Sequence, residues 1–205
     1  MPAEAAPLNG GPGLPAVEAR PLRADAQRNR ERLVVVARAA FAAATEEHVS
    51  LEGIARHAEV GIGTLYRHFP TREALVEAVY AAELNALAAS AGALLEALPP
   101  DAALRAWMNR YAEFLVTKRG MVDTLRTGWS SGRLATPVTR ERITAALAMI
   151  LAAGAQAGSL RGDVEPGDVT AMLLGVFLST ATGSTPKQTG RLLDLLVDGL
   201  RPGAD

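Results

Sequence analysis

The chain has 205 residues and a formal net charge of −1, so its overall charge points to no particular class of partner. It contains no cysteine, which excludes disulfides, thiolate catalysis and cysteine-bound metals. Residues 20–72 carry nine arginines against six carboxylates, whereas the segments on either side are net acidic. A basic segment of this kind favours contact with a polyanion through one end of the protein, although the excess is small.

The amino-terminal sequence lacks the basic start and apolar run of a signal peptide, which predicts a cytoplasmic protein. Two uncharged stretches, residues 143–160 and 169–186, approach the length of a membrane span. Both are diluted with Gly, Ala, Ser, Thr and Gln. They are therefore interpreted as buried helices of a bundle.

Residues 1–22 are predicted to form a disordered tail, because residues 1–21 hold five of the twelve prolines and no periodic apolar pattern. An alternative role is an arm in the DNA minor groove, with Arg20, Arg23 and Arg28 as its charges. A first long helix is predicted over residues 26–44. Its apolar stripe is Leu33, Ala37, Ala40, Phe41 and Ala44.

Residues 50–79 have the pattern of two short helices joined by a tight turn and followed by a third helix. Ser50 can cap the first helix and Thr71 the third. Gly61 in the turn can adopt a left-handed conformation. Leu65 and Phe69 lie four residues apart on the inward face of the second helix, and the proline after Phe69 ends that helix. This arrangement is a helix-turn-helix, whose second helix enters the major groove of DNA.

The helix that begins at Thr71 is predicted to continue to about residue 92 and to be shared by both halves of the chain. Further helices are predicted over residues 103–117, 121–126, 137–157, 166–181 and 187–200, with a loop at 128–137. No strand pattern is present. The predicted fold class is therefore all-α, with an N-terminal three-helix domain and a C-terminal helical bundle.

The run from Ile54 to Leu75, and above all Gly63-Thr64-Leu65-Tyr66-Arg67-His68-Phe69, closely resembles the DNA-binding domain of TetR-type regulators. The resemblance covers about residues 25–80. The remainder resembles the C-terminal domain of actinobacterial members. The resemblance implies a helix-turn-helix domain at residues 23–80 and an effector-binding and dimerisation domain at residues 81–205.

The resemblance and the position of the recognition helix together identify a set of candidate DNA contacts. They are Ser50, Ile62, Gly63, Thr64, Tyr66, Arg67, His68, Thr71 and Arg72. Ile62 and Thr64 are expected at base edges, and Tyr66 at phosphate. Gly61 stands where the family often has serine, which removes one possible phosphate hydrogen bond.

The resemblance also implies a small-molecule effector site in the second domain. Its candidate residues are Trp107, Met108, Tyr111, Phe114, Met121, Leu125, Trp129, Met149 and Phe177, which include both tryptophans. Aromatic and apolar side chains with a few polar groups are typical of such pockets. Each of these residues could equally be an ordinary core residue.

The last two helices are apolar over more of their surface than one core face requires, which favours a four-helix interface in a homodimer. The candidate residues are Met172, Leu173, Val176, Leu192, Leu193, Leu196 and Leu200. Two-fold symmetry would place two recognition helices about 34–36 Å apart on a near-palindromic operator.

The resemblance implies a homodimeric repressor that binds double-stranded DNA in the cytoplasm and is released by a small molecule. No cofactor is expected, and the spacings of His48 and His57 to His68 match no metal-binding pattern. One alternative is a helical small-molecule-binding protein or enzyme with a vestigial helix-turn-helix, although the C-terminal half has no histidine or cysteine. Another is a DNA-binding protein without an effector, such as an activator.

Overall fold

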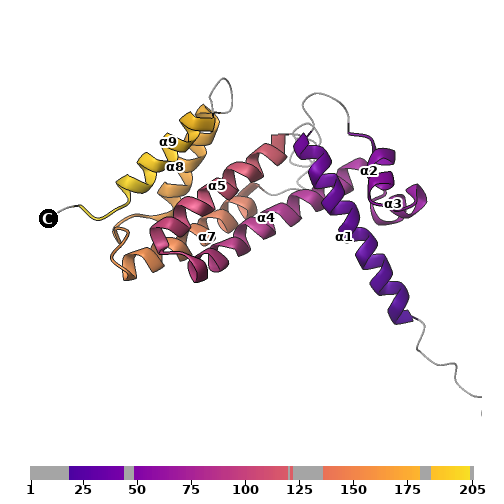
Figure 1. Ribbon diagram of the computed structural model, residues 1–205, viewed down its shortest axis with the longest axis horizontal. Helices are drawn as coiled ribbons and strands as arrows, with labels where there is room; N and C mark the ends of the chain where they lie inside the picture. The colour runs from indigo at the N-terminus through magenta and orange to yellow at the C-terminus, as the bar shows by residue number, and fades with distance from the viewer. Residues whose placement is uncertain (1–18, 44–48, 120, 122–135, 181–185, 204–205) are drawn as a thin grey trace, which may run out of the picture.

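The computed structural model describes residues 19–43, 49–119, 121, 136–180 and 186–203, and within these ranges it contains helices and no strand. The helices are α1 (Ala19–Ala43), α2 (Leu51–His57), α3 (Ile62–His68), α4 (Arg72–Ala97), α5 (Pro100–Arg119), α7 (Thr136–Gln156), α8 (Pro166–Ser179) and α9 (Pro186–Gly199). Figure 1 shows α1–α3 gathered at one end, here called the head, and α5, α7, α8 and α9 forming the body. The all-α fold class is confirmed.

The head is built around the apolar stripe predicted for α1. Leu33, Ala37 and Phe41 are at most 1% exposed, and they share one core with Ile54 of α2 and Leu65 of α3. The helix α1 begins at Ala19, earlier than the predicted start at residue 26. Because the side chains of residues 24–32 are almost all exposed, no apolar stripe marks this first half in the sequence.

The helix α4 connects the head to the body and packs against α1, α5 and α7. It buries side chains along its whole length, from Leu75 and Val79 near the head to Leu94 near its far end. It runs to Ala97, past the predicted end at residue 92, and stops where Leu98 precedes a proline and becomes extended. By length and composition α4 could cross a membrane. Its apolar composition is explained by contacts on several sides within the protein.

The body helices follow the predicted order with small shifts at their ends. Pro100 and Pro166 each occupy the first turn of a helix, where the absent N–H costs no hydrogen bond. The loop after α7 turns through Gly158, at a φ of 66°, and the Arg161 N–H donates to the Leu200 carbonyl oxygen at 2.8 Å. Of the helix predicted at residues 121–126, only Met121 is among the described residues. Of the loop predicted at residues 128–137, only residues 136 and 137 are among them. Residues 1–18 of the predicted tail also lie outside them.

Polar contacts also join α4 to the helices packed against it. The Arg38 Nε of α1 lies 2.7 Å from the Glu83 Oε1 of α4, and the Tyr80 hydroxyl is 2.9 Å from the Thr139 hydroxyl of α7. The Glu83 side chain is only 9% exposed, whereas Arg38 remains 55% exposed. Burial raises the pKa of the Glu83 carboxyl above its ordinary 4.5, and the guanidinium of Arg38 opposes this rise.

Removing Arg38 and neutralising Glu83 should have different effects on stability. We expect Arg38→Gln to lower the free energy of unfolding by about 1 kcal/mol near neutral pH, because it leaves a buried carboxylate without its partner. We expect Glu83→Gln to be near neutral or stabilising there, because the raised pKa shows that the site disfavours the charged form. Urea denaturation of both variants measures this difference.

The pH dependence gives a further check on Glu83. A carboxyl whose folded-state pKa is raised contributes stability below its unfolded pKa and loses it as pH rises through the folded value. Glu83→Gln should therefore gain stability relative to the unaltered protein as pH rises above about 4.5. If Glu83→Gln instead lost stability relative to the unaltered protein as pH rose, the pKa of Glu83 would not be raised.

Candidate nucleic-acid interface

The turn between α2 and α3 is set by a hydrogen-bonded helix ending. The Val60 N–H donates to the Ala55 carbonyl oxygen at 2.9 Å, and the Glu59 N–H donates to the Arg56 carbonyl oxygen at 3.1 Å. This pair of bonds is the Schellman motif, which requires a left-handed residue just after the helix. That residue is Glu59, with a φ of 53°. The prediction that Gly61 takes this role is wrong, because Gly61 is extended, with a φ of −60° and a ψ of 141°.

Val60 explains why the turn closes in this way. Its side chain is 8% exposed and belongs to the core. Burying it draws the chain back over the end of α2, and Gly61 then begins α3 as an N-cap without a side-chain hydrogen bond. A Cβ on Gly61 would meet only the Thr64 hydroxyl oxygen, at 4.0 Å, so a serine fits at this position.

The recognition helix α3 has a buried side and an exposed side. Leu65 and Phe69 are 0% and 2% exposed, as predicted. The opposite side carries Ile62 and Tyr66, which are 40% and 44% exposed, together with the exposed Gly63 and Arg67. A Cβ on Gly63 would meet no atom within 4 Å, so a DNA backbone could approach closely here. Thr64 and His68 are half-buried at the edges of this face.

The flanking helices present their amino termini beside α3. The Ser50 hydroxyl accepts a hydrogen bond from the Gly53 N–H at 3.0 Å, and the Thr71 hydroxyl accepts one from the Ala74 N–H at 3.2 Å. Both predicted caps are thus confirmed. The remaining free N–H groups of the first turn of α4 favour an anion such as phosphate.

Arg72 has a structural contact that the sequence did not reveal. Its guanidinium donates to the Val49 carbonyl oxygen and lies over the Phe41 ring, 5.5 Å from the centroid. Arg30 lies in a similar way over the Phe69 ring, at 5.2 Å. These arginines brace the head core from outside. A phosphate contact by Arg72 stays a prediction. It would have to use the guanidinium N–H groups that do not bind Val49.

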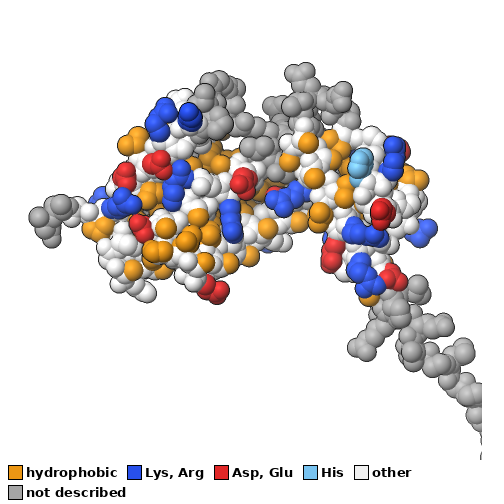
Figure 2. All heavy atoms as spheres, viewed as in Figure 1, with side chains coloured by type: hydrophobic (Ala, Val, Ile, Leu, Met, Phe, Trp, Pro, Cys, Tyr) orange, Lys and Arg blue, Asp and Glu red, His pale blue; other side chains and the backbone are white. Residues whose placement is uncertain are grey.

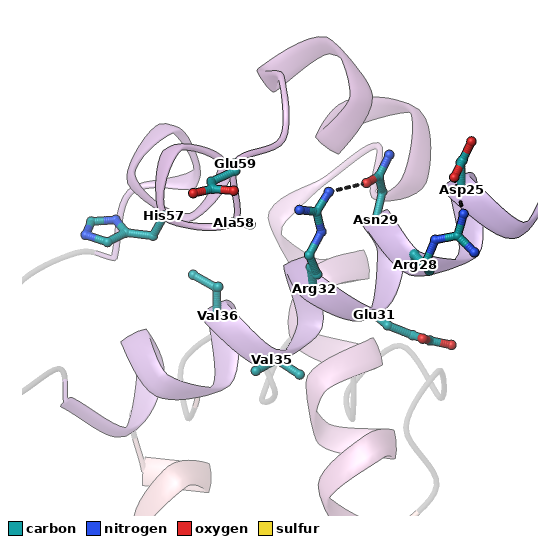
Figure 3. A pocket seen from close by; sticks show the side chains of 10 residues that line it. All are labelled: Asp25, Arg28, Asn29, Glu31, Arg32, Val35, Val36, His57, Ala58 and Glu59. Atoms are coloured by element: carbon teal, nitrogen blue, oxygen red, sulfur yellow. Dashed lines mark hydrogen bonds and ion pairs between the residues drawn. The ribbon is translucent and has the colours of Figure 1, made fainter. Parts of the chain in front are cut away.

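A groove of about 850 Å³ runs between the first half of α1 and the end of α2 (Figure 3). In it Arg28 is paired with Asp25, and Arg32 donates to the Asn29 side chain at 2.6 Å. The carboxylates of Glu31 and Glu59 also line it. Figure 2 likewise shows acidic and basic side chains interspersed on the visible face of this end. The head therefore has no uninterrupted basic surface on that face, and the side chains of Arg20 and Arg23 lie outside the described residues.

Most of the candidate effector residues come together in the body. Tyr111 stands at the centre of an aromatic cluster, with ring centroids 5.7 Å from Trp107, 6.2 Å from Phe114 and 5.1 Å from Phe177. Met108 and Met121 are buried in the same core. Burial raises the pKa of Tyr111 to about 12, so its hydroxyl stays protonated. Met149 is 52% exposed, apart from this cluster, and Leu125 and Trp129 lie outside the described residues.

The candidate dimer residues divide into two groups. The first group is buried within the subunit, at most 5% exposed, and consists of Leu173, Leu193, Leu196 and Leu200. These side chains were expected at a dimer surface, and they are not on the surface. Met172 is 56% exposed, and Val176 and Leu192 are half-buried. Three further leucines, which were not among the candidates, are more exposed: Leu174 at 41%, Leu178 at 67% and Leu195 at 67%. In helices with apolar residues on every side, spacing alone does not show which stripe faces the core.

Within the described part of the chain, no group of three His, Asp or Glu side chains is placed to hold a metal ion. His57 is instead hydrogen-bonded to the Gly53 carbonyl oxygen, at 2.8 Å from its Nδ1. His48 lies outside the described residues.

An exposed recognition helix, positioned by a turn that the buried Val60 anchors and flanked by two capped helix amino termini, defines a helix-turn-helix DNA-binding protein. The family model described as "Bacterial regulatory proteins, tetR family" matches residues 33–79. The model described as "Transcriptional regulator SbtR-like, C-terminal domain" matches residues 99–202. The chain belongs to the TetR family of bacterial transcriptional regulators.

Solved structures extend this likeness over most of the chain. A TetR transcriptional regulator from Streptomyces coelicolor is 44% identical, covers 85% of this chain and 99% of its own, and has a TM-score of 0.73. A TetR regulatory protein from Mycobacterium vanbaalenii is 35% identical over 89% of this chain and 100% of its own, with a TM-score of 0.69. An HTH-type transcriptional regulator of Staphylococcus aureus (strain USA300) is 36% identical over 64 residues, 31% of this chain and 35% of that protein. The match therefore spans about a third of that relative's length.

The left-handed Glu59 gives a testable consequence for the stability of the head. We expect Glu59→Gly to raise the free energy of unfolding by about 0.5 kcal/mol, because relief of left-handed strain exceeds the added freedom of glycine in the unfolded chain. A matched control is Glu141→Gly, at an exposed position within α7, which should cost about 1 kcal/mol. Urea denaturation of both variants compares them, and equal destabilisation would contradict a strained Glu59.

Proposed function

We propose that this TetR-family regulator is a homodimeric repressor that binds a near-palindromic operator and is released by a small-molecule effector. The observation that carries the DNA-binding part is the exposed side of α3, where Ile62, Gly63, Tyr66 and Arg67 lie together while Leu65 and Phe69 hold the helix from behind. Such a protein works in the cytoplasm, where the chromosome is. The matches to Streptomyces and Mycobacterium proteins support an actinobacterial type.

The proposed division of labour on DNA follows from exposure and chemistry. Ile62, Gly63 and Thr64 at the amino end of α3 approach the base edges in the major groove. Tyr66, Arg67 and His68 contact phosphate on one side, and Ser50, Thr71 and Arg72 contact it at the flanking helix ends. Phosphate contacts fix the register of the helix in the groove, and base contacts give the sequence preference.

Selection of bound fragments from the source genome by the purified protein, followed by footprinting, tests the proposed function. We expect recovery of a short near-palindrome. Arg67→Gln should weaken binding about tenfold and reduce the slope of log affinity against log salt by about one, because one phosphate contact is lost. Arg142→Gln, an exposed arginine of α7, is the control and should bind as the unaltered protein does. Sequence-indifferent binding alone would contradict a specific regulator.

The proposed effector site is the region of the aromatic cluster in the body. Its supports are the buried Trp107, Tyr111 and Phe177 and their proximity to α4, which leads to the head. Release then follows from a population shift: the effector binds more tightly to a state in which the two recognition helices no longer match the operator spacing. The coupling is of order 1–3 kcal/mol in such systems.

The proposed dimer interface is the exposed apolar surface of α8 and α9. Met172, Leu178 and Leu195 lie on it, and Leu195 lines an open groove of about 410 Å³ along α9. Leaving leucines of this kind in water is unfavourable, whereas pairing two copies about a two-fold axis buries them.

A charge at this surface should separate the subunits. We expect Leu195→Asp to shift the protein from dimer to monomer, measured by sedimentation velocity, because the carboxylate would be buried without a partner in the dimer. Val35→Asp is the matched control, since Val35 is 65% exposed but lies on α1 in the head. If Leu195→Asp stayed dimeric at the same concentration, the interface would lie elsewhere.

A further inference from the structure

A cleft of about 220 Å³ lies where the head meets the body, away from the recognition helix. It is formed by α1, α4 and α5, and its main lining residues are Arg38, Glu83, Ser90, Arg110, Glu113 and Phe114. Only Phe114 also belongs to the aromatic cluster of the proposed effector site. The cleft is thus a separate, more polar site beside that cluster.

The floor of the cleft is buried and its rim is exposed. Glu83 is 8% exposed, and Phe114 and Leu87 are 3% and 4% exposed. Arg110 and Glu113 are exposed on α5, and Arg38 reaches in from α1 to hold Glu83. A charged side chain that is nine-tenths buried, with solvent-facing charges of both signs above it, makes a site with polar specificity.

The charges that line the cleft are balanced in number. Two guanidinium groups and two carboxylates line it. Burial raises the pKa of the Glu83 carboxyl, the guanidinium of Arg38 opposes this rise, and the negative charge of Glu113 adds to it. A cationic group would find carboxylate acceptors in this cleft, and an anionic group would find guanidinium donors at the same rim.

We propose that this cleft binds a small zwitterion of the amino-acid class. Its ammonium group lies between Glu83 and Glu113, and its carboxylate binds Arg110 beside Arg38. The volume corresponds to about seven water molecules, which suits a small amino acid and excludes a drug-sized ligand. A net-neutral ligand also suits a lining whose formal charges sum to zero.

The position of the cleft gives such a ligand a route to the head. Arg38 stands one residue after the buried Ala37 on α1, the helix whose Phe41 packs in the core with Leu65 of α3. A ligand that draws Arg38 toward its own carboxylate weakens the contact with Glu83, and so alters how α1 sits on α4. This effect on operator binding rests on the proposed function, whereas the binding of the zwitterion does not.

The indole N–H of Trp107 offers a local reporter for the test. It donates to the Leu87 carbonyl oxygen at 3.0 Å, and Leu87 lines the cleft. In a ¹H–¹⁵N spectrum of the full-length protein the two tryptophans give two indole signals, which Trp129→Phe assigns. The probes are glycine, alanine, serine, glutamate and lysine as free amino acids, with ethylammonium and acetate as ions of a single charge.

We expect at least one amino acid to give a saturable shift of the Trp107 indole signal at millimolar concentration, and neither single-charge ion to do so. Arg110→Gln and Glu113→Gln should each weaken this binding about tenfold, because each removes a charge-assisted hydrogen bond. Arg142→Gln should leave it unchanged. The absence of any saturable shift, saturation by a single-charge ion alone, or binding unaffected by both substitutions would overturn the proposal.

Operator affinity measured with and without the amino acid that binds separates this proposal from the proposed function. Loss of specific operator binding altogether would refute the regulator while leaving the zwitterion site standing. Specific operator binding without any amino-acid shift would refute the site while leaving the regulator standing.

Discussion

Burial along the whole of α4 is the constraint on which the rest of the structure depends. At its first turns Leu75, Val76 and Val79 close the core of the head, and further on Leu84, Leu87 and Leu94 close the core of the body. A continuous helix with buried residues at both ends cannot bend or slide at one end without disturbing close-packed side chains at the other. The orientation of α3 relative to the body is therefore coupled to the packing of the body through α4.

Polar contacts add direction to this packing. Hydrophobic burial holds α1 against α4, but it is roughly non-directional. The Arg38–Glu83 contact, in contrast, forms at only one position along the two helices. The Tyr80–Thr139 contact does the same between α4 and α7. Both cost desolvation, and Glu83 shows this through its raised pKa. Such contacts stabilise little in total, so a modest ligand energy is enough to change them.

The sequence predicted well whatever depends on local chemistry. The caps Ser50 and Thr71 and the inward pair Leu65 and Phe69 follow from side-chain type and helical spacing. It predicted poorly what tertiary packing decides. The burial of Val60 selects the left-handed Glu59, although Gly61 is intrinsically better suited to that conformation. Arg72 is drawn inward by Phe41 and Val49, which only the fold brings near.

The last two helices also show that spacing alone does not tell which apolar residues face the core. In α8 the residues Leu173 and Phe177 face the core, while Leu174 and Leu178 face away, and the members of each pair are four residues apart. A subunit that folds alone has no need of the second set. This second set is the surface through which we propose that two copies of the chain pair. Since these helices lie at the end opposite the head, such pairing leaves both recognition helices free for DNA.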